Sequence, residues 1–163
     1  MNGKERRKNI QENIKRPALP FKQRSIFIRH LDCGSCNACE LELNALTNSV
    51  YDIAQYGIHF EASPRHADIL AMTGPYTRSL DEAARLTLEA MPIPRIISIG
   101  DCSKDGGVFK GSYTVGNPPD EIEKAIKVHV PGCPPTPTEI LEALLMLTID
   151  NSEWTTVDKK PDR

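Results

Sequence analysis

The stretch RSIFIRHLDCGSCNACELEL, residues 24–43, joins three kinds of sequence. Residues 24–31 are rich in β-branched and aromatic side chains, which predicts a short strand. DCGSCNAC then interrupts the strand as a loop with three cysteines, and ELEL begins a run with apolar residues at helical spacing. A strand, a loop and a helix in this order predict the first β–α unit of an α/β domain.

The same alternation continues along the chain. Apolar, β-branched runs predict further strands at residues 58–62, 67–74, 95–100 and 127–130, the first of them at a sheet edge. Apolar residues at helical spacing predict helices over residues 40–57, 79–91 and 136–149, and a short helical turn before the last strand. Strands that alternate with helices in this way predict a mainly parallel sheet.

Local signals predict where these helices begin and end. Gly57 is expected to end the first helix, and Ser79 is expected to cap the start of the second. Thr136 or Thr138 is expected near the cap of the last helix, where Pro137 is tolerated in the first turn.

Length and charge limit the classes of protein that the chain resembles. Its 163 residues predict one domain, at residues 23–149, between a basic arm (1–22) and a polar tail (150–163). The arm lacks the apolar core that a signal peptide or membrane anchor needs, so neither is expected. It is interpreted as a solvated segment, with a docking tail that orders against a partner as the alternative. The net charge of −2 gives no electrostatic case for nucleic-acid binding. No segment reaches the roughly 18 apolar residues that a membrane-spanning helix needs.

The five cysteines all follow predicted strands. Cys33, Cys36 and Cys39 come directly after the first strand, Cys102 lies two residues after RIISIG, and Cys133 lies three after KVHV. The carboxyl ends of parallel strands share one edge of a sheet, and ligands bind in the crevice outside them. Glycines in the same loops allow the backbone to approach a bulky group closely. We therefore expect the fold to gather these distant thiols at one place.

The residue types leave four interpretations of this cluster of thiols. The odd cysteine count and the absence of a secretion signal argue against a disulfide framework. Four thiolates are the ligand set of a 4Fe–4S cluster, and the spacing favours this interpretation. A zinc site usually pairs two short C-x2–4-C motifs, whereas this chain has only one such group. Dithiol chemistry at Cys36 and Cys39, or purely structural cysteines, are the other two interpretations.

Four blocks of the chain, taken in order, resemble one known family. CNACELE (36–42), SPRHADILAMTG (63–74), ISIGDCSKDGG (97–107) and VPGCPPTPTEIL (130–141) resemble the small, electron-transferring subunit of nickel–iron hydrogenases. The same blocks resemble the homologous subunit of respiratory complex I, of the NuoB or PSST type. The first block has C-x-x-C where the complex I subunit has adjacent cysteines, and the chain is short. Both features are similar to the group 4, membrane-bound energy-converting hydrogenases, which include formate hydrogenlyase and carbon-monoxide-linked enzymes.

The resemblance implies a fold and a set of ligands. The fold is a flavodoxin-like, three-layer domain with the iron–sulfur site at the carboxyl ends of the strands. The family pattern assigns one 4Fe–4S cluster to Cys36, Cys39, Cys102 and Cys133. Cys33 lies outside the pattern as a bystander thiol, with a role in place of Cys36 as a less favoured alternative. No catalytic residue is expected in this chain.

The resemblance also implies a function and partners. The subunit would pass electrons between a ferredoxin-like subunit and a nickel–iron centre that the large, catalytic subunit holds. The complex would include membrane subunits, with this chain bound peripherally on the cytoplasmic side and carrying no transmembrane segment. One alternative is a NuoB-like subunit of a quinone- or sulfur-reducing enzyme related to complex I. An alternative of another class is a zinc-stabilised binding module.

The histidines and acids near the blocks receive more ordinary predictions. His30, His59 and His129 are expected to be structural or surface residues. The same is expected of His66, with a place near the cluster or an interface as the alternative, because it belongs to a matching block. Glu40 and its neighbour Glu42 are interpreted as favourable charges in a first helical turn, with a proton route or an interface as the alternative.

Overall fold

Five parallel strands form one sheet in the computed structural model, which describes residues 25–149 of the chain. The predicted arm and tail lie outside the described residues. The strands are β1 (Ile26–Asp32), β2 (Ile58–Phe60), β3 (Ile69–Thr73), β4 (Ile96–Ile99) and β5 (Ile126–Val130). Their order across the sheet is β2-β1-β3-β4-β5, and each neighbouring pair is parallel. This is the doubly wound order of flavodoxin-like domains, so the predicted fold class is confirmed.

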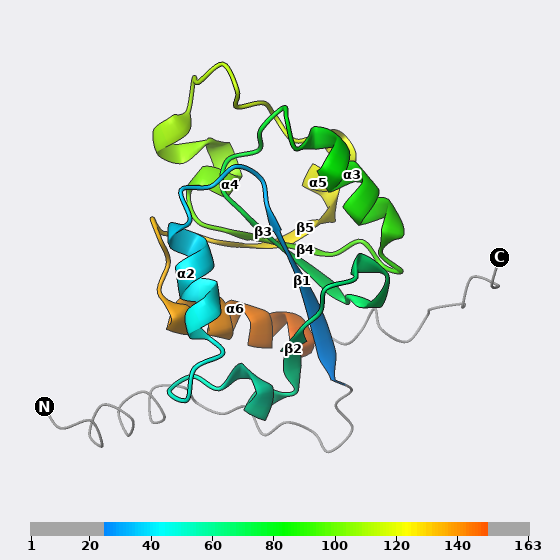
Figure 1. The fold of residues 1–163 in the computed structure, drawn as a ribbon, viewed down its shortest axis with the longest axis vertical. Helices are drawn as coiled ribbons and strands as arrows, with labels where there is room; N and C mark the ends of the chain where they lie inside the picture. Colours follow the sequence, from blue (N-terminus) through cyan, green and yellow to red (C-terminus); the bar gives the residue numbers. More distant parts are fainter. Residues whose placement is uncertain (1–24, 150–163) are drawn as a thin grey trace, which may run out of the picture.

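Helices cover both faces of the sheet, which gives three layers (Figure 1). The α-helices are α2 (Ala38–Ala45), α3 (Asp81–Ala90), α4 (Cys102–Asp105), α5 (Asp120–Ala125) and α6 (Pro137–Ile149). Short 3-10 helices are η1 (Ile53–Tyr56), η2 (Pro64–His66) and η3 (Gly107–Phe109). In Figure 1, α2 and α6 lie on one side of the sheet, and α3 and α5 lie on the other.

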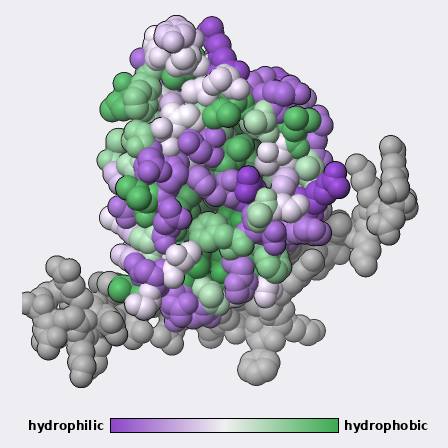
Figure 2. Space-filling view, viewed as in Figure 1, coloured by the Kyte–Doolittle hydropathy of each residue, from purple (hydrophilic) through white to green (hydrophobic). Residues whose placement is uncertain are grey.

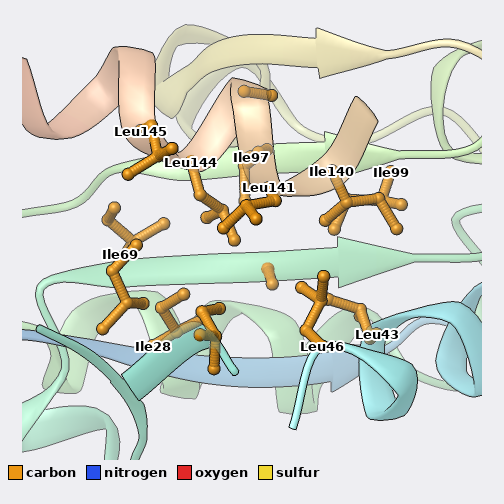
Figure 3. Close-up of a cluster of buried hydrophobic side chains, with 14 of the residues drawn as sticks. Ile28, Leu43, Leu46, Ile69, Ile97, Ile99, Ile140, Leu141, Leu144 and Leu145 are labelled. Atoms are coloured by element: carbon orange, nitrogen blue, oxygen red, sulfur yellow. The ribbon is translucent and has the colours of Figure 1, made fainter. Parts of the chain in front are cut away.

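Each face of the sheet has its own hydrophobic core. On the α2 and α6 face, aliphatic side chains of the central strands interdigitate with those of the two helices (Figure 3). This core includes Ile28, Leu43, Leu46, Ile69, Ile97, Ile99, Ile140, Leu141, Leu144 and Leu145. The second core joins the other face to α3 and α5 and includes Cys33, Leu70, Met72, Tyr76, Ala84, Leu88, Ile96 and Ile122. Because both faces are covered, β3 and β4 are buried along their whole length, as parallel strands usually are.

The first helix is much shorter than predicted. The helix expected over residues 40–57 ends at Ala45, and the chain turns before the 3-10 helix η1. Asn48 explains the break, because its side-chain oxygen accepts hydrogen bonds from the backbone N–H groups of Val50 and Tyr51. These bonds form a turn that competes with a continuing helix. Gly57 ends η1 in a left-handed conformation with φ of 73°.

The caps of the other helices were predicted with mixed success. Ser79 does not cap α3, since the helix begins after Leu80 and no side chain caps it. The Ser79 hydroxyl lies 3.3 Å from that of Thr77 instead. For α6, the prediction of Thr136 is confirmed: its backbone N–H donates to the Glu139 carboxylate at 2.7 Å, and the Glu139 N–H donates back to Thr136 Oγ1 at 3.4 Å.

Two short helical turns, α4 and η3, were not predicted at all. They follow β4 and bring the chain back on itself directly after Cys102. Among the helices of residues 25–149, none has the length and apolar character that crossing a membrane requires.

Candidate functional site

Four cysteines lie at the carboxyl edge of the sheet, in loops from three strands. Cys36 precedes α2 and Cys39 lies in its first turn, both after β1. Cys102 begins α4 after β4, and Cys133 follows β5. The parallel arrangement of β1, β4 and β5 therefore brings together segments that are about 100 positions apart in the sequence.

The electrostatics of the thiols indicate that these four sulfurs share one site. Burial raises the pKa of Cys39 to about 12, with further contributions from Glu40 and from the thiols of Cys102, Cys36 and Cys133. Burial also raises the pKa of Cys102, and Cys133 and Cys36 contribute to the same shift. Since Coulomb interactions weaken with distance, these contributions indicate that the thiols of Cys36 and Cys133 lie near those of Cys39 and Cys102.

Cys33 lies apart from this group. Its side chain is only 1% exposed and packs in the second core, on the face of α3 and α5. Burial, and then the carboxylate of Asp32, raise the pKa of the Cys33 thiol to about 12. Its backbone oxygen accepts a hydrogen bond from the Thr77 hydroxyl at 2.7 Å, which fixes the segment. The structure thus places Cys33 as a packed core thiol rather than beside the other sulfurs.

Two glycines leave room for sulfur atoms. Gly100 has φ of 90°, and a Cβ atom there would lie 2.7 Å from the Sγ of Cys39. Gly107 has φ of 49°, and a Cβ atom there would lie 2.8 Å from the Sγ of Cys102. Both positions therefore require glycine for two reasons, the left-handed backbone and the close approach of a thiol.

Hydrogen bonds hold the cysteine loops in place. Asp32 Oδ1 accepts from the N–H groups of Gly34 at 2.8 Å and Ser35 at 2.7 Å, which shapes the loop before Cys36. Asp101 joins the other two loops in both directions: its Oδ1 accepts from Gly132 N–H at 2.8 Å, and its own N–H donates to Gly132 O at 2.9 Å. The loops of Cys102 and Cys133 are therefore tied to each other.

Hydrogen-bonded polar side chains of β4, α4 and β5 lie next to the loops of Cys102 and Cys133. They were not predicted from the sequence. Ser98 Oγ lies 2.6 Å from Ser103 Oγ and 3.1 Å from His129 Nδ1. The Ser103 hydroxyl donates to Gly100 O at 2.7 Å. Burial lowers the pKa of His129, which favours the neutral ring. The only signal in the sequence was a serine inside the otherwise apolar run RIISIG.

Glu40 lies in the first turn of α2, as predicted, but it is buried there, next to Cys39 in the chain. It is 8% exposed, and the Thr73 hydroxyl donates to its Oε1. His30 Nε2 lies 3.0 Å from Thr73 Oγ1 and 3.6 Å from Glu40 Oε1. Among the described residues, Glu40 Oε2 is buried without a hydrogen-bond partner. Burial lowers the pKa of His30 and outweighs the opposing effect of Glu40.

His66 is not at the site. It lies in η2, which precedes β3, and it is exposed. It therefore lies at the amino edge of the sheet, opposite the edge that carries the cysteines. Two other histidines lie closer to the cysteine loops: His30 contacts Glu40, the neighbour of Cys39, and His129 contacts Ser98.

The thiols do not close around a single metal ion. Within residues 25–149, no three His, Cys, Asp or Glu side chains are placed to hold one. A zinc ion draws its sulfurs in to about 2.3 Å, whereas a 4Fe–4S cluster spreads four thiolates over four irons. Four thiols at one edge of the sheet, two of them beside glycines, match the ligand set of the cluster in number and kind. The assignment of these ligands stays a prediction.

Comparison with known proteins identifies the family. Residues 36–147 match the family model described as NADH ubiquinone oxidoreductase, 20 Kd subunit. The chain is 39% identical to the probable membrane-bound hydrogenase subunit mbhJ of Pyrococcus furiosus, over 90% of this chain and 87% of that protein. It is also 39% identical to formate hydrogenlyase subunit 7 of Escherichia coli, over 82% of this chain and 52% of that protein, so it spans about half of that relative.

Solved structures agree with these matches. The fold is similar to a chain of the membrane-bound sulfane sulfur reductase, an archaeal respiratory membrane complex, with a TM-score of 0.65 and 27% identity over 79% of this chain and 72% of that chain. It shares its fold with a chain of an NAD+-reducing NiFe hydrogenase, with a TM-score of 0.57 and 20% identity over 77% and 92% of the two chains. The resemblance inferred from the four blocks is confirmed. The chain belongs to the family of the NADH ubiquinone oxidoreductase 20 kDa subunit, which makes it a subunit of an oxidoreductase complex.

Proposed function

We propose that this chain is the electron-transfer small subunit of a membrane-associated nickel–iron hydrogenase. In this proposal Cys36, Cys39, Cys102 and Cys133 hold one 4Fe–4S cluster next to a nickel–iron centre in the large subunit. The observation that carries the proposal is that the loops of these four cysteines meet at the carboxyl edge of the sheet, where Gly100 and Gly107 leave room for the sulfurs of Cys39 and Cys102. The similarity to mbhJ over most of both chains supports the hydrogenase assignment.

The residues around the thiols would bind the cluster and control its surroundings. When bound, the cluster accepts and releases single electrons. Gly100 and Gly107 leave space for its sulfur ligands, and the Asp101–Gly132 hydrogen bonds fix the separation of two ligand loops. Cys39 packs against the hydrophobic core on the α2 and α6 face of the sheet, which shields this side of the ligand set from water. Cys36 and Cys133 are exposed, which leaves the outer side for a partner.

An exposed apolar surface beside Cys102 supports a partner at that position. Val108 is 77% exposed and Tyr113 is 86% exposed, and Phe109 lies between them. Figure 2 shows hydrophobic surface at the upper left, over η3, whereas the loop that follows it at the top is less hydrophobic. Exposed apolar residues that gather into a patch often mark a site of association. The large catalytic subunit would cover this surface, and a ferredoxin-like subunit would supply or receive electrons.

The complex would be attached to the cytoplasmic side of the membrane through other subunits. The relatives named above include subunits of membrane-bound enzymes, which supports a peripheral position for this chain.

A second candidate function keeps the cluster in this chain but changes the substrate that the complex reduces. The likeness to the membrane-bound sulfane sulfur reductase favours a sulfur- or quinone-reducing enzyme related to complex I, with the same cluster in this chain. Nickel in the large subunit distinguishes the two functions. A zinc-stabilised module has weaker support, because zinc sites usually pair two short C-x2–4-C motifs and this chain has only one such group.

The test is to purify the complex without oxygen through a tag on this chain and to measure nickel and hydrogen-dependent dye reduction. We expect both in the wild type. Cys102→Ser should lose the activity, and Cys33→Ser, the matched control, should keep it. Iron and sulfide without nickel would move the chain to the sulfur- or quinone-reducing branch. Full activity in the Cys102→Ser variant would contradict the ligand assignment.

A further inference from the structure

The loop after β3 holds the backbone of the loop that leads to Cys36. The Thr77 hydroxyl donates a hydrogen bond to the backbone oxygen of Cys33 at 2.7 Å, and the Thr77 N–H donates to the same oxygen at 3.2 Å. Thr77 is only 8% exposed, and a hydrogen bond in a buried environment is stronger than the same bond in water. The Cys33 carbonyl, three residues before Cys36, is therefore firmly held.

The two loops touch along their backbones. A Cβ atom on Gly34 would lie 2.5 Å from Thr77 Cγ2, and a Cβ atom on Gly74 would lie 2.6 Å from the backbone nitrogen of Ser35. Neither glycine therefore leaves space for a side chain. The loop before Cys36 is consequently packed directly against the loop after β3, with Thr77 at the point of contact.

The backbone of Thr77 is itself fixed by a third segment. Thr77 and Val115 form an isolated antiparallel bridge. On one side of this bridge, the Gly116 N–H donates to Tyr76 O at 2.9 Å. On the other side, the N–H of the residue that follows Thr77 donates to Thr114 O at 2.9 Å. The Thr77 hydroxyl therefore donates from a defined position.

Asp32 and Ser35 give the loop before Cys36 its internal shape. Asp32 Oδ1 accepts from two N–H groups of the loop, and Ser35 Oγ accepts from the N–H of Asn37 at 3.0 Å. These bonds join residues two or three positions apart, so they do not fix where the loop lies relative to β3. The hydrogen bond from the Thr77 hydroxyl spans 44 positions and does fix it.

We propose that the Thr77 hydroxyl is a positioning group for Cys36, because it holds the Cys33 carbonyl and thereby sets where this ligand of the cluster lies. The inference rests on the cluster of the proposed function. Cys36 is exposed, so the packing of its own side chain does not fix the sulfur. The position of the sulfur depends instead on the backbone before it. Losing the hydroxyl should therefore shift Cys36 relative to the cluster.

Thr77→Val and Thr77→Ser form a matched pair for the test. Valine has almost the same shape as threonine but no hydroxyl, whereas serine keeps the hydroxyl and loses only the methyl group. The measurement is EPR, in the intact anaerobic complex, of the reduced-cluster signal that disappears in Cys133→Ser. The g values of this signal should shift in Thr77→Val and match the wild type in Thr77→Ser. Iron should also pass to a chelator roughly fivefold faster in Thr77→Val, the size of effect expected for one lost hydrogen bond.

Thr87→Val is the control for a general loss of stability. The Thr87 hydroxyl donates to Ala83 O at 2.7 Å within α3, a helix that carries none of the cysteines. The same substitution there removes the same kind of bond, so Thr87→Val should keep the wild-type spectrum and the wild-type rate of iron release. A wild-type spectrum in an assembled Thr77→Val complex, or an equal change in Thr77→Ser, would overturn the inference.

A second measurement applies to the chain itself if Thr77→Val does not assemble into the complex. Amide hydrogen exchange of the cluster-depleted full chain, followed by mass spectrometry, reports on the loop before Cys36. Residues 34–36 should exchange severalfold faster in Thr77→Val than in the wild type, whereas α6 should exchange at the wild-type rate. Unchanged exchange of residues 34–36 would overturn the inference.

The failure of this inference differs from the failure of the proposed function. A Cys133-dependent signal that is present and unchanged in Thr77→Val overturns the role of Thr77 and leaves the cluster in place. If no EPR signal depends on Cys133, both proposals are overturned together.

Discussion

Gly100 is the position where a single methyl group would meet a ligand sulfur. A Cβ atom there would lie 2.7 Å from Cys39 Sγ, and φ is 90°. Gly111 has nearly the same backbone, with φ of 86°, but nothing lies within 4 Å of the corresponding position. Alanine costs about 1–2 kcal/mol of backbone strain at either position. Only Gly100→Ala should also displace the Cys39 thiol.

The prediction is that Gly100→Ala loses the iron–sulfur cluster while Gly111→Ala keeps it. Iron content and visible absorbance of the purified complex measure the difference. Equal cluster content in the two variants would show that the space beside Cys39 is not needed.

Cys33 should be inert toward alkylation in the folded protein. The thiolate is the reactive form, and burial raises the pKa of Cys33 to about 12, above the usual value of about 8.5. Its thiolate fraction at about pH 9 is therefore on the order of one in a thousand, and it grows only as the pH rises toward 12. Iodoacetamide followed by mass spectrometry should modify exposed Cys36 and Cys133 in cluster-depleted folded protein well before Cys33. In denaturant, all three should react alike. Modification of Cys33 at the rate of Cys36 in the folded protein would contradict its burial.

At the residue scale, the strand-end pattern predicted that all five cysteines gather at one edge of the sheet, but it did not separate Cys33, which packs in the second core, from the other four. It did not predict the burial of Glu40, since a first-turn glutamate usually faces water. The contact with Thr73 depends on how α2 is turned against β3, and neither local sequence contains that information. His30 was missed for the same reason.

Among the elements, the loops after β4 and β5 are joined through one side chain. Asp101 Oδ1 accepts from Gly132 N–H at 2.8 Å, and the Asp101 N–H donates to Gly132 O at 2.9 Å. Asp101→Asn keeps a side-chain oxygen that can accept this bond, whereas Asp101→Ala removes it at a cost of about 1 kcal/mol. We expect Asp101→Ala to lose its cluster faster to an iron chelator than the wild type. Asp101→Asn should lose it at close to the wild-type rate, and equal rates in the two variants would exclude the hydrogen bond as the cause.

Helix α6 is held to the sheet by fully buried leucines. Leu144 is 0% exposed and packs among the strands and α2, as Figure 3 shows. Leu144→Ala should lower the free energy of unfolding by about 2–5 kcal/mol, because it removes buried methyl groups and leaves a cavity. Met146, on the same helix, is 66% exposed. Met146→Ala should therefore change the free energy of unfolding by less than about 0.5 kcal/mol. Denaturant melts of the cluster-free chain measure both. A loss in Leu144→Ala no larger than in Met146→Ala would contradict the described packing.

The elements that the sequence predicted well are those with a clear period or a strong cap. The strands β3 and β4 are mainly apolar and buried throughout, and α6 begins with the Thr136–Glu139 capping box. The failures are short or competing structures. Helix α2 was extended too far because Asn48 forms a local turn that apolar spacing does not reveal. The turns α4 and η3 are too short to show any period.

For the whole molecule, the order of the strands decides where the chemistry lies. The order β2-β1-β3-β4-β5 places the carboxyl ends of β1, β4 and β5 along one edge, with β3 between β1 and β4. The sequence predicted a parallel sheet, and the family resemblance supplied the flavodoxin-like order. Partner surfaces were beyond prediction from the sequence, because the exposure of Val108 and Tyr113 depends on the folded loop.

The central claim is that this chain holds one 4Fe–4S cluster on Cys36, Cys39, Cys102 and Cys133. The most direct measurement compares iron and acid-labile sulfide per complex, in parallel anaerobic preparations, between the wild type and Cys133→Ser. Cys33→Ser serves as the control. We predict that Cys133→Ser lacks one cluster's worth of iron and sulfide, about four of each, and that Cys33→Ser matches the wild type. Unchanged iron and sulfide in an assembled Cys133→Ser complex would contradict the account.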